Sequence, residues 1–87
     1  MKLTPDQVWF ESQIRNIGGV PDTKGPYKFV FEVDSSYAVE LTKFYAREFD
    51  IIKHGGGWWK HKTRNLIALL TGYTSRPGKL YVSAKPE

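Results

Sequence analysis

The chain of 87 residues contains no cysteine, and this absence most constrains how it can fold. Neither a disulfide framework nor a zinc site built on thiolates is available to hold so short a chain together. A chain of this size buries only about 60 to 65% of the surface of its unfolded state, which leaves room for one core. We therefore expect a single compact domain over residues 1–87, stabilised by apolar packing. Because 15% of the residues are aromatic, that core should be aromatic.

Two features of the sequence indicate where in the cell the protein is expected. No apolar run reaches the roughly 18 to 20 residues that a membrane span requires. Residues 1–6 also lack the apolar stretch of a signal peptide. The sequence therefore predicts a soluble, intracellular protein, cytoplasmic by default, that has no membrane partner.

Helix signals occur twice. Thr4 precedes a proline, and Gln7 follows three residues later, which is the pattern of a capping box at a helix start. This predicts a helix over residues 5–16, ended by the glycine pair at 18–19. A second helix is expected over residues 36–48, because an Asp-Ser-Ser run offers N-cap oxygens and apolar residues then recur at spacings of three and four.

Strand signals follow the first helix. Residues 20–26 hold two prolines and a glycine, which predicts a loop that pairs with no other strand. In residues 27–33 every second residue is Tyr, Phe or Val, and this alternation predicts a strand. Its core-facing side chains would be those of Tyr27, Phe29, Phe31 and Val33.

The second half of the chain predicts two hairpins. Residues 49–54 and 58–62 flank three glycines that allow a tight reversal. Residues 64–73 fit either a helix or a buried strand. We favour a strand, because a Ser-Arg-Pro-Gly turn follows and residues 80–84 then alternate. The expected fold is α+β, in the order α-β-α-β-β-β-β. A sheet of four to five antiparallel strands packs on one or two helices, and the first helix covers an edge or a flank.

Motifs of known enzymes are incomplete. The segment from His54 to Trp58 (HGGGW) matches an oxyanion-hole sequence of lipases, but the G-x-S-x-G nucleophile motif is missing and the chain is too short for that fold. His54 and His61 are the only histidines, and two ligands do not make a zinc site. No phosphate-binding loop is present, because Leu80 follows Gly78-Lys79 where Ser or Thr is needed. We expect no enzymatic activity, no metal and no cofactor.

Charge is divided unevenly along the chain. Residues 1–50 hold six Lys and Arg against eight Asp and Glu, whereas residues 51–87 hold seven against Glu87 alone. The second part thus carries a positive charge that would attract phosphates or an acidic protein surface.

Residues 53–64 (KHGGGWWKHKTR) combine four basic side chains, two histidines and two adjacent tryptophans within twelve positions. Adjacent residues of a strand point to opposite faces, so one of Trp58 and Trp59 should be exposed, unless the sheet is covered on both sides. An exposed indole among cations suits single-stranded DNA or RNA, because bases stack on the ring and cations contact phosphates. The main hypothesis is nucleic-acid binding through this basic aromatic hairpin. The candidate residues are Lys53, His54, Trp58, Trp59, Lys60, His61, Lys62 and Arg64, with Arg76 and Lys79 as an extension.

A second hypothesis uses the same residues. Trp and Arg dominate the energetics of protein interfaces, so the hairpin could instead anchor on an acidic groove of a protein partner. Small phage or viral accessory proteins that bind and inhibit a host enzyme have this size and composition. Edge strands of so small a sheet could also pair to form a homodimer.

Overall fold

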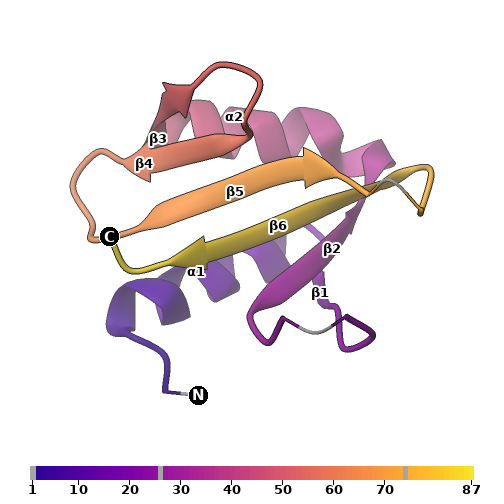
Figure 1. Cartoon of the computed structure of the whole chain (residues 1–87), viewed down its shortest axis with the longest axis horizontal. Helices are drawn as coiled ribbons and strands as arrows, with labels where there is room; N and C mark the ends of the chain where they lie inside the picture. The colour runs from indigo at the N-terminus through magenta and orange to yellow at the C-terminus, as the bar shows by residue number, and fades with distance from the viewer. Residues whose placement is uncertain (1, 26, 74) are drawn as a thin grey trace.

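The computed structural model describes residues 2–25, 27–73 and 75–87, and for Lys53 it describes the main chain alone. It confirms the α+β fold, with two α-helices and one antiparallel sheet (Figure 1). The helices are α1 (Pro5–Asn16) and α2 (Ala38–Glu48), with a short 3-10 helix (Ser35–Tyr37) before α2. The strands are β1 (Val20–Pro21), β2 (Val30–Asp34), β3 (Phe49–Lys53), β4 (Trp58–His61), β5 (Ile67–Gly72) and β6 (Lys79–Lys85).

The sheet has the strand order β1-β2-β6-β5-β4-β3. Strands β3 to β6 form a meander of hairpins, and β2 joins it beside β6. All neighbouring strands are antiparallel, so β2 and β3, four steps apart, run in the same direction. A connection between such strands must cross the sheet, and α2 is that crossover.

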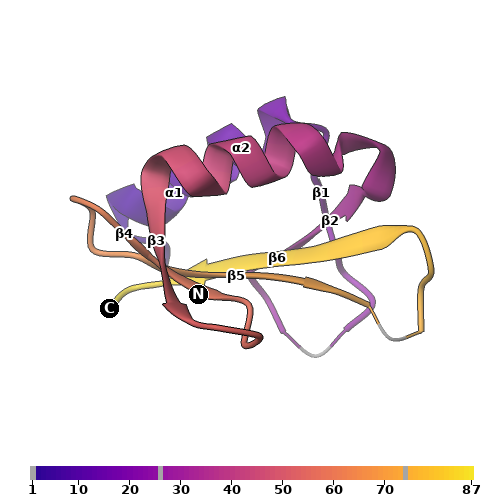
Figure 2. The same ribbon diagram turned by 90° about the horizontal axis from the view of Figure 1, so that it is seen from above.

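Both helices lie on the same face of the sheet (Figure 2). The turn between β3 and β4 and the described residues just before β2 (27–29) project from the other face. The prediction that α1 covers an edge or a flank is therefore wrong. The helix packs on the face because Phe10 and Ile14 are fully buried in the core, and the amide of Gln7 donates to the Ala84 carbonyl (3.2 Å). Neither described helix combines the length and apolar character needed to cross a bilayer.

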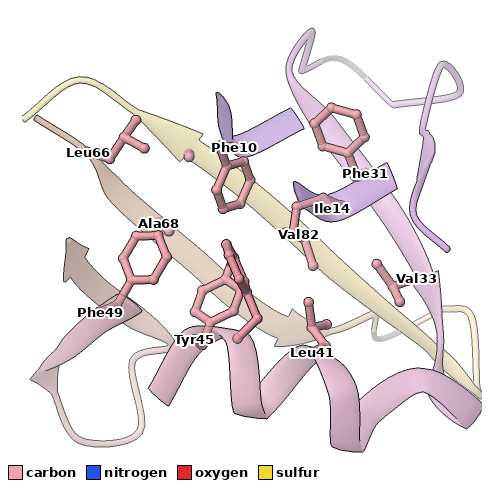
Figure 3. Close-up of a cluster of buried hydrophobic side chains, with 12 residues drawn as sticks. Phe10, Ile14, Phe31, Val33, Leu41, Tyr45, Phe49, Leu66, Ala68 and Val82 are labelled. Carbon is pink, nitrogen blue, oxygen red and sulfur yellow. The ribbon is translucent and has the colours of Figure 1, made fainter. Parts of the chain in front are cut away.

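The core between the helices and the sheet is aromatic, as predicted (Figure 3). Phe10 of α1 contacts the rings of Tyr45 and Phe49 edge-on, each at 6.3 Å between centroids. Tyr45 and Phe49 stack at 5.1 Å, and the Tyr45 hydroxyl donates to the Leu69 carbonyl (2.9 Å). Aliphatic side chains of both helices and the inner strands fill the spaces between these rings. These contacts close one side of the sheet against water.

The sequence signals for helices and turns are largely confirmed. Thr4 and Gln7 form the expected capping box at the start of α1. The β3–β4 turn needs glycine at position 57, because its φ is +73° and a Cβ there would lie 2.7 Å from the Leu70 carbonyl oxygen. Residues 67–72 form a strand, which resolves the ambiguity in favour of the second hairpin.

Three local predictions are wrong. Val20 and Pro21, expected in a loop, pair with Glu32 and Phe31 as strand β1, because a proline is tolerated at a sheet edge. This pairing makes six strands rather than four or five. The strand expected from residue 27 begins at Val30, and Tyr27, expected in the core, is 67% exposed. Pro26, the last residue of the expected loop, lies outside the described residues.

Candidate functional site

The face of the sheet without helices is lined by alternate residues of β4, β5 and β6. Trp58 lies opposite Leu69, which lies opposite Ser83, which in turn lies opposite Val30 of β2. Directly opposite residues of antiparallel strands share a face, so this row crosses four strands on one side. Tyr81, two residues before Ser83, lies on the same face. We call this surface the helix-free face.

A groove with a volume of about 680 Å³ lies along the helix-free face. Its floor is formed by the row from Trp58 to Val30, and residues 27–29, which precede β2, line it as well. The aromatic residues along it are Tyr27, Phe29, Trp58, Tyr73 and Tyr81, and the cations are Lys28 and Lys85. The surface thus offers several rings and two cations in one concave site.

The two adjacent tryptophans diverge, as their strand geometry predicts. Trp59 packs on the helix-covered side, edge-on to Tyr45 at 5.6 Å between centroids. Trp58 lies on the helix-free face, where the Lys85 ammonium is 5.1 Å from its ring centroid. Both indoles are half-buried. Trp58 is therefore the indole that lines the open groove, with a cation already over its ring.

One end of the groove is held by a network around Asp22. The Tyr73 hydroxyl donates to the Asp22 carboxylate (2.6 Å), and Tyr73 contacts Tyr81 edge-on at 5.2 Å between centroids. The Arg76 guanidinium bonds the same carboxylate (3.1 Å) and lies 4.5 Å from the Tyr73 ring centroid. The hydroxyl of Tyr73 and the amide of Lys24 lower the pKa of Asp22, and burial together with Asp22 raises the pKa of Tyr73. The network fixes the ring of Tyr73 at the groove.

The positive charge of the second half of the chain is largely paired with the first half. Arg76 also bonds Glu32 (3.0 Å), and Lys79 bonds Asp34 (3.1 Å). The hydrogen bonds from Ser36 and Lys79 hold the pKa of Asp34 well below its usual range. The extended positive field expected from the sequence is therefore reduced, because Arg76 and Lys79 contact carboxylates from the other half.

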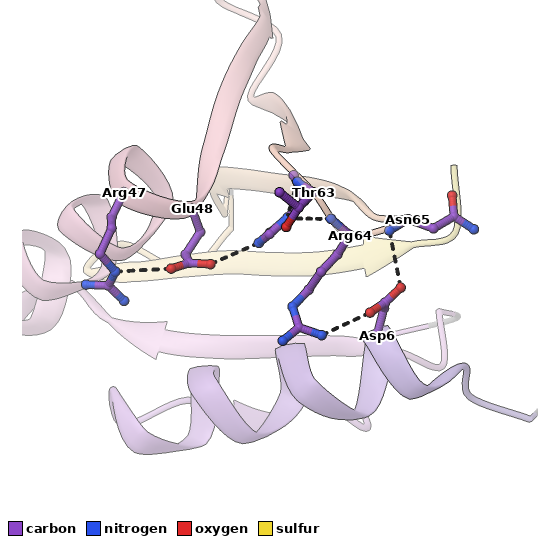
Figure 4. A network of polar contacts seen from close by, with 7 residues as sticks. Asp6, Arg47, Glu48, Thr63, Arg64 and Asn65 are labelled. Carbon is purple, nitrogen blue, oxygen red and sulfur yellow. Dashed lines mark hydrogen bonds and ion pairs between the residues drawn. The ribbon is translucent and has the colours of Figure 1, made fainter.

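Arg64 is likewise engaged within the molecule (Figure 4). Its guanidinium bonds Asp6 of α1 (3.0 Å) and lies 4.0 Å from the ring centroid of Trp9. The second carboxylate oxygen of Asp6 accepts from the amide of Asn65 (3.2 Å). These contacts fasten the β4–β5 connection to the start of α1.

His61 is buried and fully hydrogen-bonded. Its Nδ1 accepts from the main-chain N–H groups of Thr63 (3.0 Å) and Arg64 (2.8 Å), so Nε2 carries the proton and donates to Glu48 (2.9 Å). This hydrogen bond and Arg47 lower the pKa of Glu48. Trp9 and Phe49 contact the imidazole edge-on. His61 therefore holds the turn after β4 and presents no free nitrogen to a ligand.

The remaining candidates lie near Trp58 or in solvent. Lys60 is on the helix-free face and pairs with Glu87 (3.1 Å), both side chains being about half exposed. His54 and Lys62 are exposed in the turns on either side of β4. The side chain of Lys53 lies outside the described part of the chain.

Several residues of the groove are absent from the sequence-based set. Among them are Tyr27, Lys28, Leu69, Tyr73, Tyr81 and Lys85. The alternation of β6 contained part of the signal, because assigning Val82 and Ala84 to the core leaves Tyr81 and Lys85 on the opposite face. What the sequence could not reveal is that this opposite face has no helix over it.

Within residues 2–25, 27–73 and 75–87, no three potential ligands among His, Asp and Glu come together to hold a metal ion. Comparison of the chain with protein-family models, curated proteins and solved structures found no match. The site is therefore interpreted from its own geometry.

Proposed function

We propose that this domain is a non-enzymatic binding protein that takes up single-stranded nucleic acid on the helix-free face. The observation that carries the proposal is the position of Trp58, which lines an open groove with the Lys85 ammonium beside its ring. The hairpin expected from the sequence contributes Trp58 and Lys60, whereas the rest of the surface comes from β5, β6 and the segment before β2.

The rings of the groove support stacking of unpaired bases. Trp58 and Tyr81 lie two strands apart and two residues apart along the strands. Strand spacing and rise therefore separate their Cα atoms by about 12 Å. A single strand that crosses the sheet diagonally can place different bases on the two rings. Stacking on such rings tolerates different sequences, because every base has an aromatic face.

Three lysines around the rings support contacts with phosphates. Lys28 and Lys85 line the groove and are exposed. Lys60 is held by Glu87 in an exposed ion pair, which contributes little to stability, so a phosphate can replace the carboxylate. The net charge of +4 favours approach of a polyanion.

A protein partner is the alternative, and the apolar floor of the groove favours it. Leu69, Val30 and Phe29 also line the groove. A partner with an acidic rim and an apolar centre would match this surface, since interfaces place apolar residues centrally and charges at the rim. In that case the domain would act as an interaction module.

The test is fluorescence anisotropy with labelled DNA and RNA single strands of about 12 nucleotides. Three phosphate contacts predict a salt slope of about −2, so affinity should fall roughly 20-fold between about 50 and 200 mM salt. Trp58→Ala should remove about 1 to 3 kcal/mol of binding free energy. Tyr37→Ala, which alters an exposed ring away from the groove, should bind as the wild type does.

A charge-matched pair sharpens this test. Lys85→Gln should reduce the salt slope by about 0.7, whereas Lys43→Gln on α2 should leave it unchanged. Absence of binding at low salt, or equal binding by the wild type and Trp58→Ala, would refute nucleic-acid binding. A nuclease-resistant complex with an acidic protein that Trp58→Ala weakens would favour the interaction module instead.

A further inference from the structure

Strand β6, in the middle of the sheet (Figure 1), carries a lysine at each end. Lys79 begins the strand and Lys85 ends it. They are an even number of residues apart, so both lie on the helix-free face, about 20 Å from each other along the strand. The two ends of this face can therefore be compared at one residue type on one strand.

At the Lys79 end of the face, carboxylates already engage the cations. The Lys79 ammonium bonds Asp34 (3.1 Å) and lies 3.8 Å from the Glu32 carboxylate. The Arg76 guanidinium pairs with Glu32 (3.0 Å) and with Asp22 (3.1 Å). In this network three carboxylates face two cations, so an additional phosphate is unfavourable at this end.

At the Lys85 end, cations form a row across the sheet. Lys60 of β4 and Lys85 of β6 both stand opposite Ile67 of β5, one on each side of it. We call these three residues the basic row. Two strand spacings separate the two lysines by about 10 Å, and successive charges of one nucleic-acid strand are about 3.4 Å apart. The basic row thus spans about three phosphates, and Glu87 on Lys60 is the exposed pair that a phosphate replaces.

The rings of the groove lie on one side of the basic row only. Trp58 precedes Lys60 by two residues, and its ring centroid is 5.1 Å from the Lys85 ammonium. Tyr81 lies farther from the row, between it and Lys79. In the other direction β6 ends at Lys85. A nucleotide whose phosphate lies on the basic row can therefore stack its base only toward Trp58 and Tyr81.

We infer that the helix-free face binds nucleic acid in one orientation, with about three consecutive phosphates along the basic row and the unpaired bases on Trp58 and Tyr81. This inference rests on the proposed function and specifies its ligand as an unpaired segment of about three nucleotides. The sugar-phosphate backbone runs across the strands of the sheet. The groove of about 680 Å³ has the size of a small-ligand site, which suits so short a segment.

The two lysines of β6 test the orientation through the anisotropy of a labelled single strand of about 12 nucleotides. Lys85→Gln should weaken binding about fivefold at about 100 mM salt and lower the salt slope by about 0.7. Lys79→Gln removes the same charge from the same strand and face. It should change the affinity less than about twofold and leave the slope unchanged. Circular dichroism checks that both variants are folded.

A length series tests the size of the bound segment. Unlabelled thymidine strands of one to about 12 nucleotides compete with the labelled strand. Affinity should rise up to about three nucleotides and then improve about tenfold or less, which the larger number of binding positions on a longer strand supplies. Tyr81→Ala should weaken the trinucleotide at least about fivefold and leave the salt slope unchanged, because it removes a ring and no charge.

The outcomes separate the inference from the function on which it rests. If the wild type binds none of the strands, nucleic-acid binding itself is refuted and the inference falls with it. If the longest strand binds but the trinucleotide is more than about tenfold weaker, the segment is longer than inferred. If Lys79→Gln and Lys85→Gln weaken binding equally, the orientation is wrong, while nucleic-acid binding stands.

Discussion

The two faces of the sheet use aromatic residues in opposite ways. On the helix-covered face, Phe10, Tyr45 and Phe49 pack against one another and are almost completely buried. On the helix-free face, Trp58 and Tyr81 remain half-buried along an open groove. The same residue types therefore stabilise the fold on one side and remain accessible on the other. A high aromatic content in a small domain does not by itself show how large its core is.

Polar groups show the same difference: they are buried on the helix-covered face and exposed on the helix-free face. On the covered face, buried His61 and Gln7 have hydrogen-bond partners, and no buried side-chain polar atom lacks one in the described residues. On the helix-free face, Lys60 and Glu87 form an exposed pair that solvent screens. Polar contacts on the covered face are therefore part of the fold, whereas the ion pair near Trp58 is open to solvent.

The largest expected effect is on the covered face. Phe10→Ala removes a fully buried ring that contacts Tyr45 and Phe49, and should lower the free energy of unfolding by about 3 to 5 kcal/mol. Urea denaturation followed by circular dichroism measures this change. A loss below about 1 kcal/mol would contradict the assignment of α1 to the core.

The second effect concerns the buried imidazole. His61→Leu keeps an apolar body but leaves two main-chain N–H groups and Glu48 without their partner, so stability should fall by about 2 to 3 kcal/mol. Glu48→Gln is the matched control, because its amide oxygen can still accept from Nε2, and it should lower stability by less than about 1 kcal/mol. If the two variants were equally stable, the hydrogen bonds to Nδ1 would contribute nothing.

Substituting each of the two adjacent tryptophans compares how much the two faces of the sheet contribute to stability. Trp59→Ala should lower the free energy of unfolding by about 2 to 3 kcal/mol, because its ring packs on Tyr45. Trp58→Ala should lower it by about 1 kcal/mol, since its ring lies along the open groove. Urea midpoints of the two variants provide the comparison. The reverse order would contradict the placement of the indoles.

The smallest effect is the acid sensitivity of the network around Asp22. The pKa of Asp22 in the folded state lies below its unfolded value of about 4. The stabilising contribution of Asp22 is therefore complete above about pH 4. That contribution is lost as the pH falls through the folded pKa. Asp22→Asn should therefore be less stable than the wild type at neutral pH and lose less stability on acidification. The urea midpoints of the wild type and of Asp22→Asn, measured between about pH 2 and 7, show how the stability of each depends on pH.

Tyr73→Phe offers a second variant for the same network. It removes the hydroxyl that donates to Asp22 but keeps the ring that contacts Tyr81. Its pH dependence should lie between those of the wild type and Asp22→Asn. A pH dependence identical to that of the wild type would mean that this hydrogen bond does not lower the pKa of Asp22.

Sequence patterns predicted the elements better than the site. Local signals sufficed for α1, α2 and the two hairpins, because caps, glycine turns and apolar spacing act within a few residues. They failed for Tyr27, whose alternation with Phe29 matched a strand that in fact begins at Val30. They also failed for Arg64, Arg76 and Lys79, whose carboxylate partners lie more than forty residues away in the chain.

The sequence by itself determined that the two indoles of the β3–β4 hairpin point to opposite faces, because neighbouring side chains of any strand alternate. Only the tertiary structure decided which indole lines an open groove, since that depends on the face that α1 and α2 cover. It also decided which cations remain near Trp58. Charge along a chain becomes a surface only after distant residues have paired, and here the acidic first half neutralises much of the basic second half.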